Sequence, residues 1–216
     1  ACGFPEAMYA LNSKHPIALE LGAGVGFPSI AFAKALKHHQ AEMDDTINVS
    51  YQSHNSPVIL ATDTSNVSLS LITSNAHING VGDMVVAFDA NHSDLNSLSL
   101  LTQTVLRQSV GTNERREGFD IIFGSSLQSL FDGTSQQSAA LWQSLDVLLS
   151  RENANAVVLL SHVRTRDEKI NLPSTSERLF ECVRRVSGDR FGMNTRDGHS
   201  SDFELVLLRR LKNDTM

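Results

Sequence analysis

Three closely spaced glycines are the residues of this sequence whose type and spacing most directly suggest chemistry. The segment "ELGAGVG" places Gly22, Gly24 and Gly26 immediately after the apolar stretch "PIALEL". Because glycine has no Cβ, such a turn lets the backbone come close to a bound molecule. The free N–H groups at the start of a following helix would face the same site. We therefore predict a loop for a nucleotide-like ligand, with a purely structural turn as the alternative.

Acidic residues near this loop narrow the choice of ligand. The spacing G-x-G-x-G differs from the G-x-G-x-x-G of dinucleotide sites, where a pyrophosphate lies at the helix N-terminus. Glu20 would repel a pyrophosphate but would accept hydrogen bonds from an ammonium group. Asp63 ends the next apolar run, "PVILATD", where it can accept hydrogen bonds from the ribose hydroxyls of a nucleoside. Asp89 ends the third run, where it would border the adenine of such a ligand. S-adenosylmethionine has these groups and no phosphate, so the residues favour it.

The elements that must position these residues alternate along the chain. Short apolar runs follow amphipathic stretches, which is typical of a parallel sheet covered by helices on both faces. We expect strands at 16–21, 57–63, 84–89, 119–126, 155–163, 190–194 and 203–211, and helices at 27–39, 66–80, 94–109, 138–150 and 174–186. Residues 40–56 are expected to form an inserted loop. The prediction is an α/β, doubly wound, mostly parallel seven-stranded sheet with an antiparallel last strand.

Length, composition and charge limit the classes of protein that this chain can belong to. The 216 residues are predicted to form a single domain, 1–216, which lacks some N-terminal residues because the chain begins close to its first strand. A net charge of −6 argues against a nucleic-acid partner. Apolar runs are too short for a spanning helix, and no signal-peptide pattern is present. Cys2 and Cys182 lack disulfide-framework and metal-ligand spacing. We expect a cytoplasmic or nuclear monomer without a metal or membrane partner.

Several other polar and aromatic residues receive structural interpretations. His162 does not indicate a hydrolase, because no G-x-S-x-G motif accompanies it. Trp142 is predicted to pack the helix at 138–150 against the sheet. Asn75 and Asn79 are predicted to be helix-end and turn residues.

Four segments together resemble a known family. "ALELGAGVGFPSIAFAKA", "VILATD", "NAHING" and "FDIIFGSSL" are similar in order and spacing to the class I, seven-stranded S-adenosylmethionine-dependent methyltransferases. More narrowly, they resemble the lysine methyltransferase-like branch, which includes the METTL21-type and calmodulin-lysine methyltransferases. The resemblance covers nearly the whole chain and implies a Rossmann-like methyltransferase fold, S-adenosyl-L-methionine as cofactor and N-methylation of a lysine side chain in a protein substrate. The expected cofactor-binding residues are Glu20, Gly22, Ala23, Gly24, Gly26, Asp63, Thr64, Asp89, Ala90 and Ser125.

The sequence departs from that family at the ends of two strands. The family usually has Leu-x-Trp after its third strand, where this chain has "FDA", residues 88–90. After its fourth strand the family continues with an aspartate and then an aromatic residue, whereas "SSLQSLF" puts Ser126 at the position of the acid. A serine hydroxyl can hydrogen-bond an amine but cannot hold a charge, and Asp132 is the candidate substitute. We therefore predict Ser126 and Asp132 as the catalytic residues.

Three other functions remain open from the sequence. A small-molecule methyltransferase would share the cofactor half and differ only in its acceptor pocket. A cofactor-binding protein without transferase activity is suggested by the serine at position 126. An NAD-dependent oxidoreductase is disfavoured by the spacing of the glycines.

Overall fold

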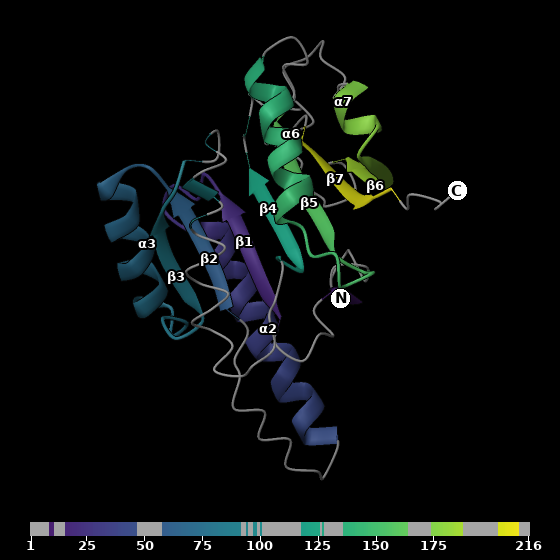
Figure 1. The fold of residues 1–216 in the computed structure, drawn as a ribbon. Helices are drawn as coiled ribbons and strands as arrows, with labels where there is room; N and C mark the ends of the chain where they lie inside the picture. The colour runs from purple at the N-terminus through teal and green to yellow at the C-terminus, as the bar shows by residue number, and fades with distance from the viewer. Residues whose placement is uncertain are drawn as a thin grey trace, which may run out of the picture.

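A seven-stranded sheet with helices on both faces forms the described part of the chain (Figure 1). The computed structural model describes residues 9–10, 16–46, 58–91, 94, 97–98, 100, 118–125, 127, 136–163, 174–187 and 203–211. Its elements are β1 (Ile17–Leu21), α2 (Phe27–Thr46), β2 (Val58–Asp63), α3 (Asn66–Ile78), β3 (Val85–Asp89), β4 (Ile121–Ser125), α6 (Gln136–Leu148), β5 (Val157–Val163), α7 (Ser174–Glu177), β6 (Phe180–Ser187) and β7 (Phe203–Arg210).

The strand order is β3-β2-β1-β4-β5-β7-β6. Strands β1 to β5 pair in parallel, and β7 pairs antiparallel with both β5 and β6. The predicted α/β, doubly wound, mostly parallel sheet with an antiparallel last strand is therefore confirmed. The order reverses between β1 and β4, and in such sheets the ligand crevice lies at the carboxyl ends of the strands beside that reversal.

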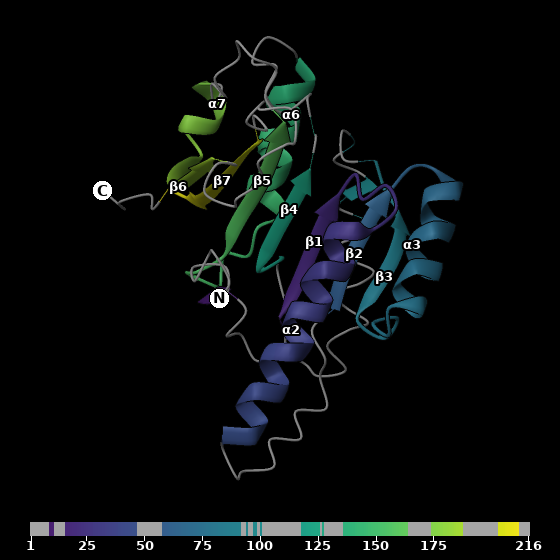
Figure 2. The ribbon, with the colours of Figure 1, turned by 180° about the vertical axis from the view of Figure 1, so that it is seen from behind.

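Two apolar cores cover the two faces of the sheet. On one face, Ile30 of α2 and Ile72 of α3 pack with the alternate side chains of the central strands. On the other face, α6 supplies Trp142, which is fully buried. The two ribbon views show α6 in front of β4 and β5, and α2 in front of β1 after rotation (Figures 1 and 2). The prediction that Trp142 packs its helix against the sheet is confirmed.

Helix α2 is longer than the sequence pattern indicates. It runs to Thr46, so the first seven residues of the predicted loop at 40–56 are helical. This segment, "QAEMDDT", has no glycine or proline and contains good helix formers, but it has no apolar face. The far half of α2 extends past the edge of the sheet, where no apolar face is required (Figure 2).

The predicted helix at 174–186 is wrong. Only Ser174–Glu177 is helical, and Phe180–Ser187 forms strand β6. The apolar residues Phe180, Val183 and Val186 are three apart, which is a helical spacing. The register of β6 against β7 shifts between Cys182 and Arg184, and a bulge of this kind turns later side chains to the other face. Phe180 packs in the core beside Trp142, with ring centroids 5.9 Å apart. Val183 lies in the opposite core by the ordinary alternation of a strand, and the bulge places Val186 there as well.

Two further predicted elements lie partly or wholly outside the described residues. Ser97, Leu98 and Leu100 are helical, within the predicted helix at 94–109, whose other residues beyond Asp94 lie outside the described part. The predicted strand at 190–194 lies wholly outside it. None of the helices within the described residues combines the length and apolar character needed to cross a membrane.

A buried carboxylate fastens the amino-terminal edge of the parallel strands. Asp120, which precedes β4, is 2% exposed. Its Oδ2 accepts the backbone N–H of Ile17 at 3.0 Å, and its Oδ1 accepts the amide of Asn153 at 2.6 Å. Asn153 also donates to the carbonyl of Ala10 at 2.7 Å. These contacts join the start of β1 to the turn before β5.

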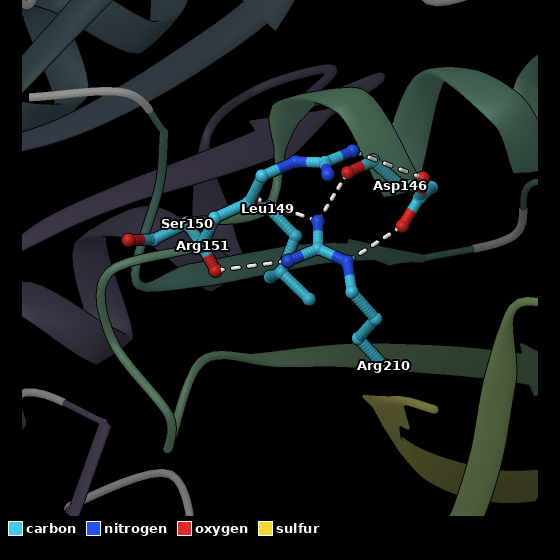
Figure 3. Close-up of polar contacts among 5 residues, drawn as sticks. All are labelled: Asp146, Leu149, Ser150, Arg151 and Arg210. Atoms are coloured by element: carbon cyan, nitrogen blue, oxygen red, sulfur yellow. Dashed lines mark hydrogen bonds and ion pairs between the residues drawn. The ribbon is translucent and has the colours of Figure 1, made fainter. Parts of the chain in front are cut away.

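An arginine from the last strand closes the same edge (Figure 3). Arg210 donates from Nε to the carboxylate of Asp146 at 2.6 Å, and its Nη2 donates to the carbonyls of Asp146 and Leu149. Its Nη1 donates to the carbonyl of Ser150 at 3.1 Å. A helix leaves its last carbonyls without intrahelical partners and carries partial negative charge there, so a guanidinium stabilises the end of α6.

Candidate ligand-binding site

The carboxyl ends of the central strands bring most of the predicted site residues to one edge. Leu21, which precedes the glycine loop, lies in register with Thr62 and with Gly124. Asp63 lies in register with Asp89. The glycine loop, the acids ending β2 and β3, and Ser125 at the end of β4 therefore share the edge at which the strand order reverses.

The glycine loop, residues 20–26, adopts backbone conformations that ordinary residues avoid. Gly22, Gly24 and Gly26 have φ angles of 62°, 56° and 78°. A Cβ at Gly26 would also approach the side chain of Ile72 to 3.1 Å, so α3 packs directly beneath the loop. A Cβ at Gly24 would meet no described atom within 4 Å. The backbone at Gly24 therefore faces open space, where a ligand can approach it closely.

Asp63 joins the glycine loop to the start of α3. Its Oδ2 accepts the N–H of Gly24 at 2.9 Å, and its Oδ1 accepts the N–H of Ser65 at 2.9 Å. Ser65 is the N-cap of α3, where its side chain accepts the N–H of Ser68. The carboxylate is only partly buried. Since each carboxylate oxygen can accept more than one hydrogen bond, Asp63 retains capacity for hydroxyl donors from a ligand.

Glu20 caps the start of α2 from within the sheet. Its side chain is 1% exposed, and its Oε2 accepts the N–H of Ser29 at 3.1 Å and the Ser29 hydroxyl. A carboxylate near the first turn of a helix is stabilised by the partial positive charge there. Burial nevertheless raises the pKa of Glu20 to about 7; the bonds from Ser29 lower it, and the charge of Asp63 raises it. Contact of Glu20 with a ligand ammonium group stays a prediction.

Leu127, two residues after the end of β4, packs against the glycine loop. Leu127 is 7% exposed, and its side chain lies 3.1 Å from where a Cβ of Gly22 would be. The same side chain would come within 2.5 Å of a Cβ at Gly124. Leu127 therefore lies beside the glycine loop, and the glycines at both positions make room for its side chain.

The other predicted cofactor residues lie at the same edge. Thr64, Asp89 and Ser125 are exposed, whereas Ala23 and Ala90 are buried. Ala23 donates its N–H to the carbonyl of Thr62 at 2.8 Å. No ligand contact tests these assignments, so they stay predictions. The predicted catalytic residues, Ser126 and Asp132, lie outside the described residues.

Asn75 contacts the loop although the sequence pattern indicated only a helix-end role. It lies inside α3 rather than at its end, and its Nδ2 donates to the carbonyl of Val25 at 3.0 Å. Asn79 has the predicted capping role, since it is the C-cap residue of α3. The only local signal for Asn75 was a polar amide three residues after the buried Ile72, which does not indicate its partner.

Comparison with solved structures finds this fold in methyltransferases of different kinds. An rRNA methylase from Streptococcus thermophilus matches with a TM-score of 0.54 and 11% identity, over 96% of this chain and 96% of that chain. A geranyl diphosphate C-methyltransferase from Streptomyces coelicolor A3(2), in complex with Mg2+, geranyl diphosphate and S-adenosyl-L-homocysteine, matches with a TM-score of 0.53 and 10% identity, over 95% and 78%. The 4+2 cyclase SpnF matches with a TM-score of 0.55 and 11% identity, over 95% and 79%.

These similarities define the class of fold. The chain has the seven-stranded, Rossmann-like fold found in S-adenosylmethionine-dependent methyltransferases. At such low identity the likeness concerns the fold alone, and the fold also occurs in a cyclase. Neither the protein-family models nor the curated proteins match the sequence. The fold therefore does not by itself identify the chemistry.

Proposed function

We propose that this protein binds S-adenosylmethionine at the glycine loop and transfers its methyl group to a lysine side chain of a protein. The observation that carries the proposal is the bond from the Gly24 N–H to the carboxylate of Asp63. This bond joins the glycine loop after β1, whose glycines have left-handed backbone conformations, to an acid at the end of β2. Both lie beside the point where the strand order reverses. That combination suits a nucleoside bearing an amino acid better than one bearing a pyrophosphate.

The residues at this edge offer groups that complement such a ligand. Open space at Gly24 would admit the ligand next to backbone. Asp63 would accept hydrogen bonds from the ribose hydroxyls through its remaining lone pairs. Asp89 is exposed and Ala90 is buried at the end of β3, so they would border the adenine with one polar and one apolar group. The negative charges of Asp63 and Asp89 also complement a cationic ligand.

When bound, S-adenosylmethionine supplies a methyl group on a positively charged sulfur. The contribution of this chain is alignment of an amine with that methyl, together with surroundings that tolerate the change of charge. A lysine must lose its proton before it attacks, and Asp132 is the proposed acceptor or orienting group, with Ser126 as a hydrogen-bond partner. Support for lysine as the acceptor comes from the sequence resemblance around "GAGVG", "NAHING" and "FDIIFGSSL".

A titration with S-adenosylhomocysteine tests the binding half of the proposal. We expect calorimetric binding to the wild type and at least about a tenfold loss in Asp63→Ala, since both the Gly24 contact and the ribose acceptor disappear. Asp63→Asn should lose less, because one oxygen remains. Asp83→Ala, which removes an exposed acid in the turn before β3, is the matched control. A wild type that binds no S-adenosylhomocysteine would contradict the proposal.

Acceptor profiling with labelled cofactor tests the transfer half. Incubation with fractionated cell extract should label proteins, and hydrolysis of those proteins should release methylated lysine. Label confined to the small-molecule fraction would instead indicate a small-molecule methyltransferase. Ser126→Asp, which restores the acid of the resembling family, should raise the rate if lysine is the acceptor.

A second candidate function is cofactor binding without methyl transfer. The serine at position 126, where the resembling family has an acid, specifically favours it. Calorimetric binding of S-adenosylhomocysteine together with no labelled acceptor in any fraction would support this alternative.

A further inference from the structure

Helix α3 contacts the glycine loop through two residues that lie one turn apart. Ile72 is fully buried and packs against the backbone of Gly26. Asn75 donates from Nδ2 to the carbonyl of Val25 at 3.0 Å. These contacts span about fifty residues of sequence, so they link two separate βα units. The apolar contact fixes how close the helix lies to the loop, and the amide contact fixes the orientation of one peptide unit.

The carbonyl of Val25 needs a partner from outside α2. In a continuing helix, this carbonyl would accept the N–H of the residue four positions later, which is Ser29. Here the Ser29 N–H donates to Glu20, and the first bond of the helix runs from Ile30 to Gly26. Asn75 therefore supplies the donor that the helix does not.

Two peptide units of the loop are fixed at both of their polar groups. In the unit between Ala23 and Gly24, the carbonyl accepts the Gly26 N–H at 2.8 Å and the N–H donates to Asp63 at 2.9 Å. In the unit between Val25 and Gly26, the N–H makes that same bond to Ala23 and the carbonyl accepts Asn75. The peptide unit between Gly24 and Val25 lies between them, at the residue where an added Cβ would meet no described atom.

We propose that Asn75 is a positioning residue for ligand binding. Its amide holds the Val25 carbonyl in place, and so fixes the unit between Gly24 and Val25 in the orientation that a bound cofactor meets. The identity of that cofactor rests on the proposed function, whereas the effect of Asn75 on the loop does not.

Two variants of Asn75 distinguish a donor role from a packing role. Asn75→Ala removes the donor, and Asn75→Asp keeps the shape but turns a carboxylate oxygen toward the Val25 carbonyl. We expect S-adenosylhomocysteine to bind about tenfold more weakly to Asn75→Ala and more weakly still to Asn75→Asp. A residue that merely packs would give the reverse order, because aspartate preserves the volume of asparagine.

Asn79→Ala is the matched control. Asn79 is the same residue type, one turn later at the C-cap of α3, and its side chain donates to the backbone carbonyl of Asn75 instead of the loop. It should lower the unfolding free energy about as much as Asn75→Ala does and leave the affinity unchanged. Wild-type affinity in Asn75→Asp, or equal loss in Asn79→Ala, would overturn the proposal.

Amide hydrogen exchange in the ligand-free proteins provides a readout that needs no cofactor. The Gly26 N–H donates to Ala23 within the loop and the Gly24 N–H donates to Asp63, so Asn75→Ala should speed the exchange of both about tenfold and Asn79→Ala should not. If the wild type binds no S-adenosylhomocysteine, the proposed function fails, but this exchange still decides the role of Asn75. If exchange is the same in all variants, the positioning role fails even where binding persists.

Discussion

At each end of the parallel strands, an aspartate carboxylate accepts hydrogen bonds on both of its oxygens, but the two aspartates have different roles. At the amino-terminal end, Asp120 accepts the N–H of Ile17 on one carboxylate oxygen and the amide of Asn153 on the other, and is 2% exposed. At the carboxyl-terminal end, Asp63 also accepts one donor on each oxygen, from Gly24 and Ser65, but remains partly open to solvent. The protein partners do not separate a structural acid from a binding acid. Exposure to solvent separates the two acids, because only an exposed carboxylate can also accept hydrogen bonds from the hydroxyl groups of a ligand.

The two ends also differ in the contacts that surround them. Arg210 fills the amino-terminal end by donating to a carboxylate and to three backbone carbonyls at the end of α6 (Figure 3). The carboxyl-terminal end has a glycine loop whose own bonds leave open space at Gly24. The contacts at the amino-terminal end therefore serve stability, whereas those at the carboxyl-terminal end hold the glycine loop beside an open space at Gly24.

The largest expected effect is on stability, at Asp120. Asp120→Ala leaves the buried N–H of Ile17 without its acceptor and removes one of the two acceptors of the Asn153 amide, so the free energy of unfolding should fall by about 3 kcal/mol. Urea unfolding measures this change. The affinity of the folded protein for S-adenosylhomocysteine should stay the same.

Asp63→Ala is the counterpart at the other end. It should cost about 1 kcal/mol of stability, because its partners are nearer to solvent, and it should remove most of the affinity. If Asp120→Ala weakens binding as much as Asp63→Ala does, the separation between the two ends is wrong.

The next expected effect is a change of stability with pH, which arises from the ionisation of Glu20. Its pKa in the folded protein is about 7, above the ordinary 4.5, so the folded state binds the proton more tightly than the unfolded state. The unfolding free energy should therefore rise as pH falls from about 8 to 5. This one group should contribute roughly 2 to 3 kcal/mol of the rise.

Urea unfolding of wild type and Glu20→Gln at several pH values checks this contribution. Glutamine cannot ionise, so the variant should lack this part of the slope. Ser29→Ala removes one donor to the carboxylate and should extend the slope to higher pH. Equal slopes in wild type and Glu20→Gln would show that the Glu20 carboxyl has an ordinary pKa.

A smaller effect on stability is expected at the amino-terminal end of the parallel strands, at Arg210. Arg210→Met removes the donors to Asp146, Leu149 and Ser150 and should lower the unfolding free energy by about 2 kcal/mol. Arg151→Met is the matched control, because Arg151 is 63% exposed and lies 3.6 Å from the same Asp146. Its loss should be less than about 0.5 kcal/mol, as is usual for exposed ion pairs. Comparable losses from the two variants would contradict the capping role of Arg210.

A smaller effect on stability than that of Arg210→Met is expected at Gly24. Gly24→Ala places a Cβ on a backbone with a φ of 56°, at a cost of roughly 1 kcal/mol. Its Cβ would also enter the space that a ligand uses, so affinity for S-adenosylhomocysteine should fall about tenfold or more.

Gly80→Ala is the matched control for this variant. Gly80 has a φ of 68°, and a Cβ there would also meet no described atom within 4 Å, but it follows the end of α3, away from the loop. It should cost the same stability and leave affinity unchanged. Binding by Gly24→Ala at wild-type strength would remove the open space at Gly24 from the proposed site.

Strand positions and the glycine loop were predictable because their signals are local. A central parallel strand is buried on both faces, so "IALEL" and "VILATD" are nearly continuous apolar runs. The end of α2 and the whole of β6 were not predictable in the same way. The spacing of Phe180, Val183 and Val186 matches a helix, and only pairing with β7 makes this segment a strand whose bulge places Val186 in the core opposite Phe180.

The sequence by itself determined where the backbone must turn and which acids end the strands, since glycine conformation and strand burial depend on neighbouring residues. Tertiary structure alone decided what those acids do. Glu20 became a buried cap for α2 with a raised pKa, Asp63 became a bridge between two βα units, and Asn75 became the partner of the Val25 carbonyl. Burial and hydrogen bonds between distant residues exist only when the chain is packed, so no local pattern indicates them.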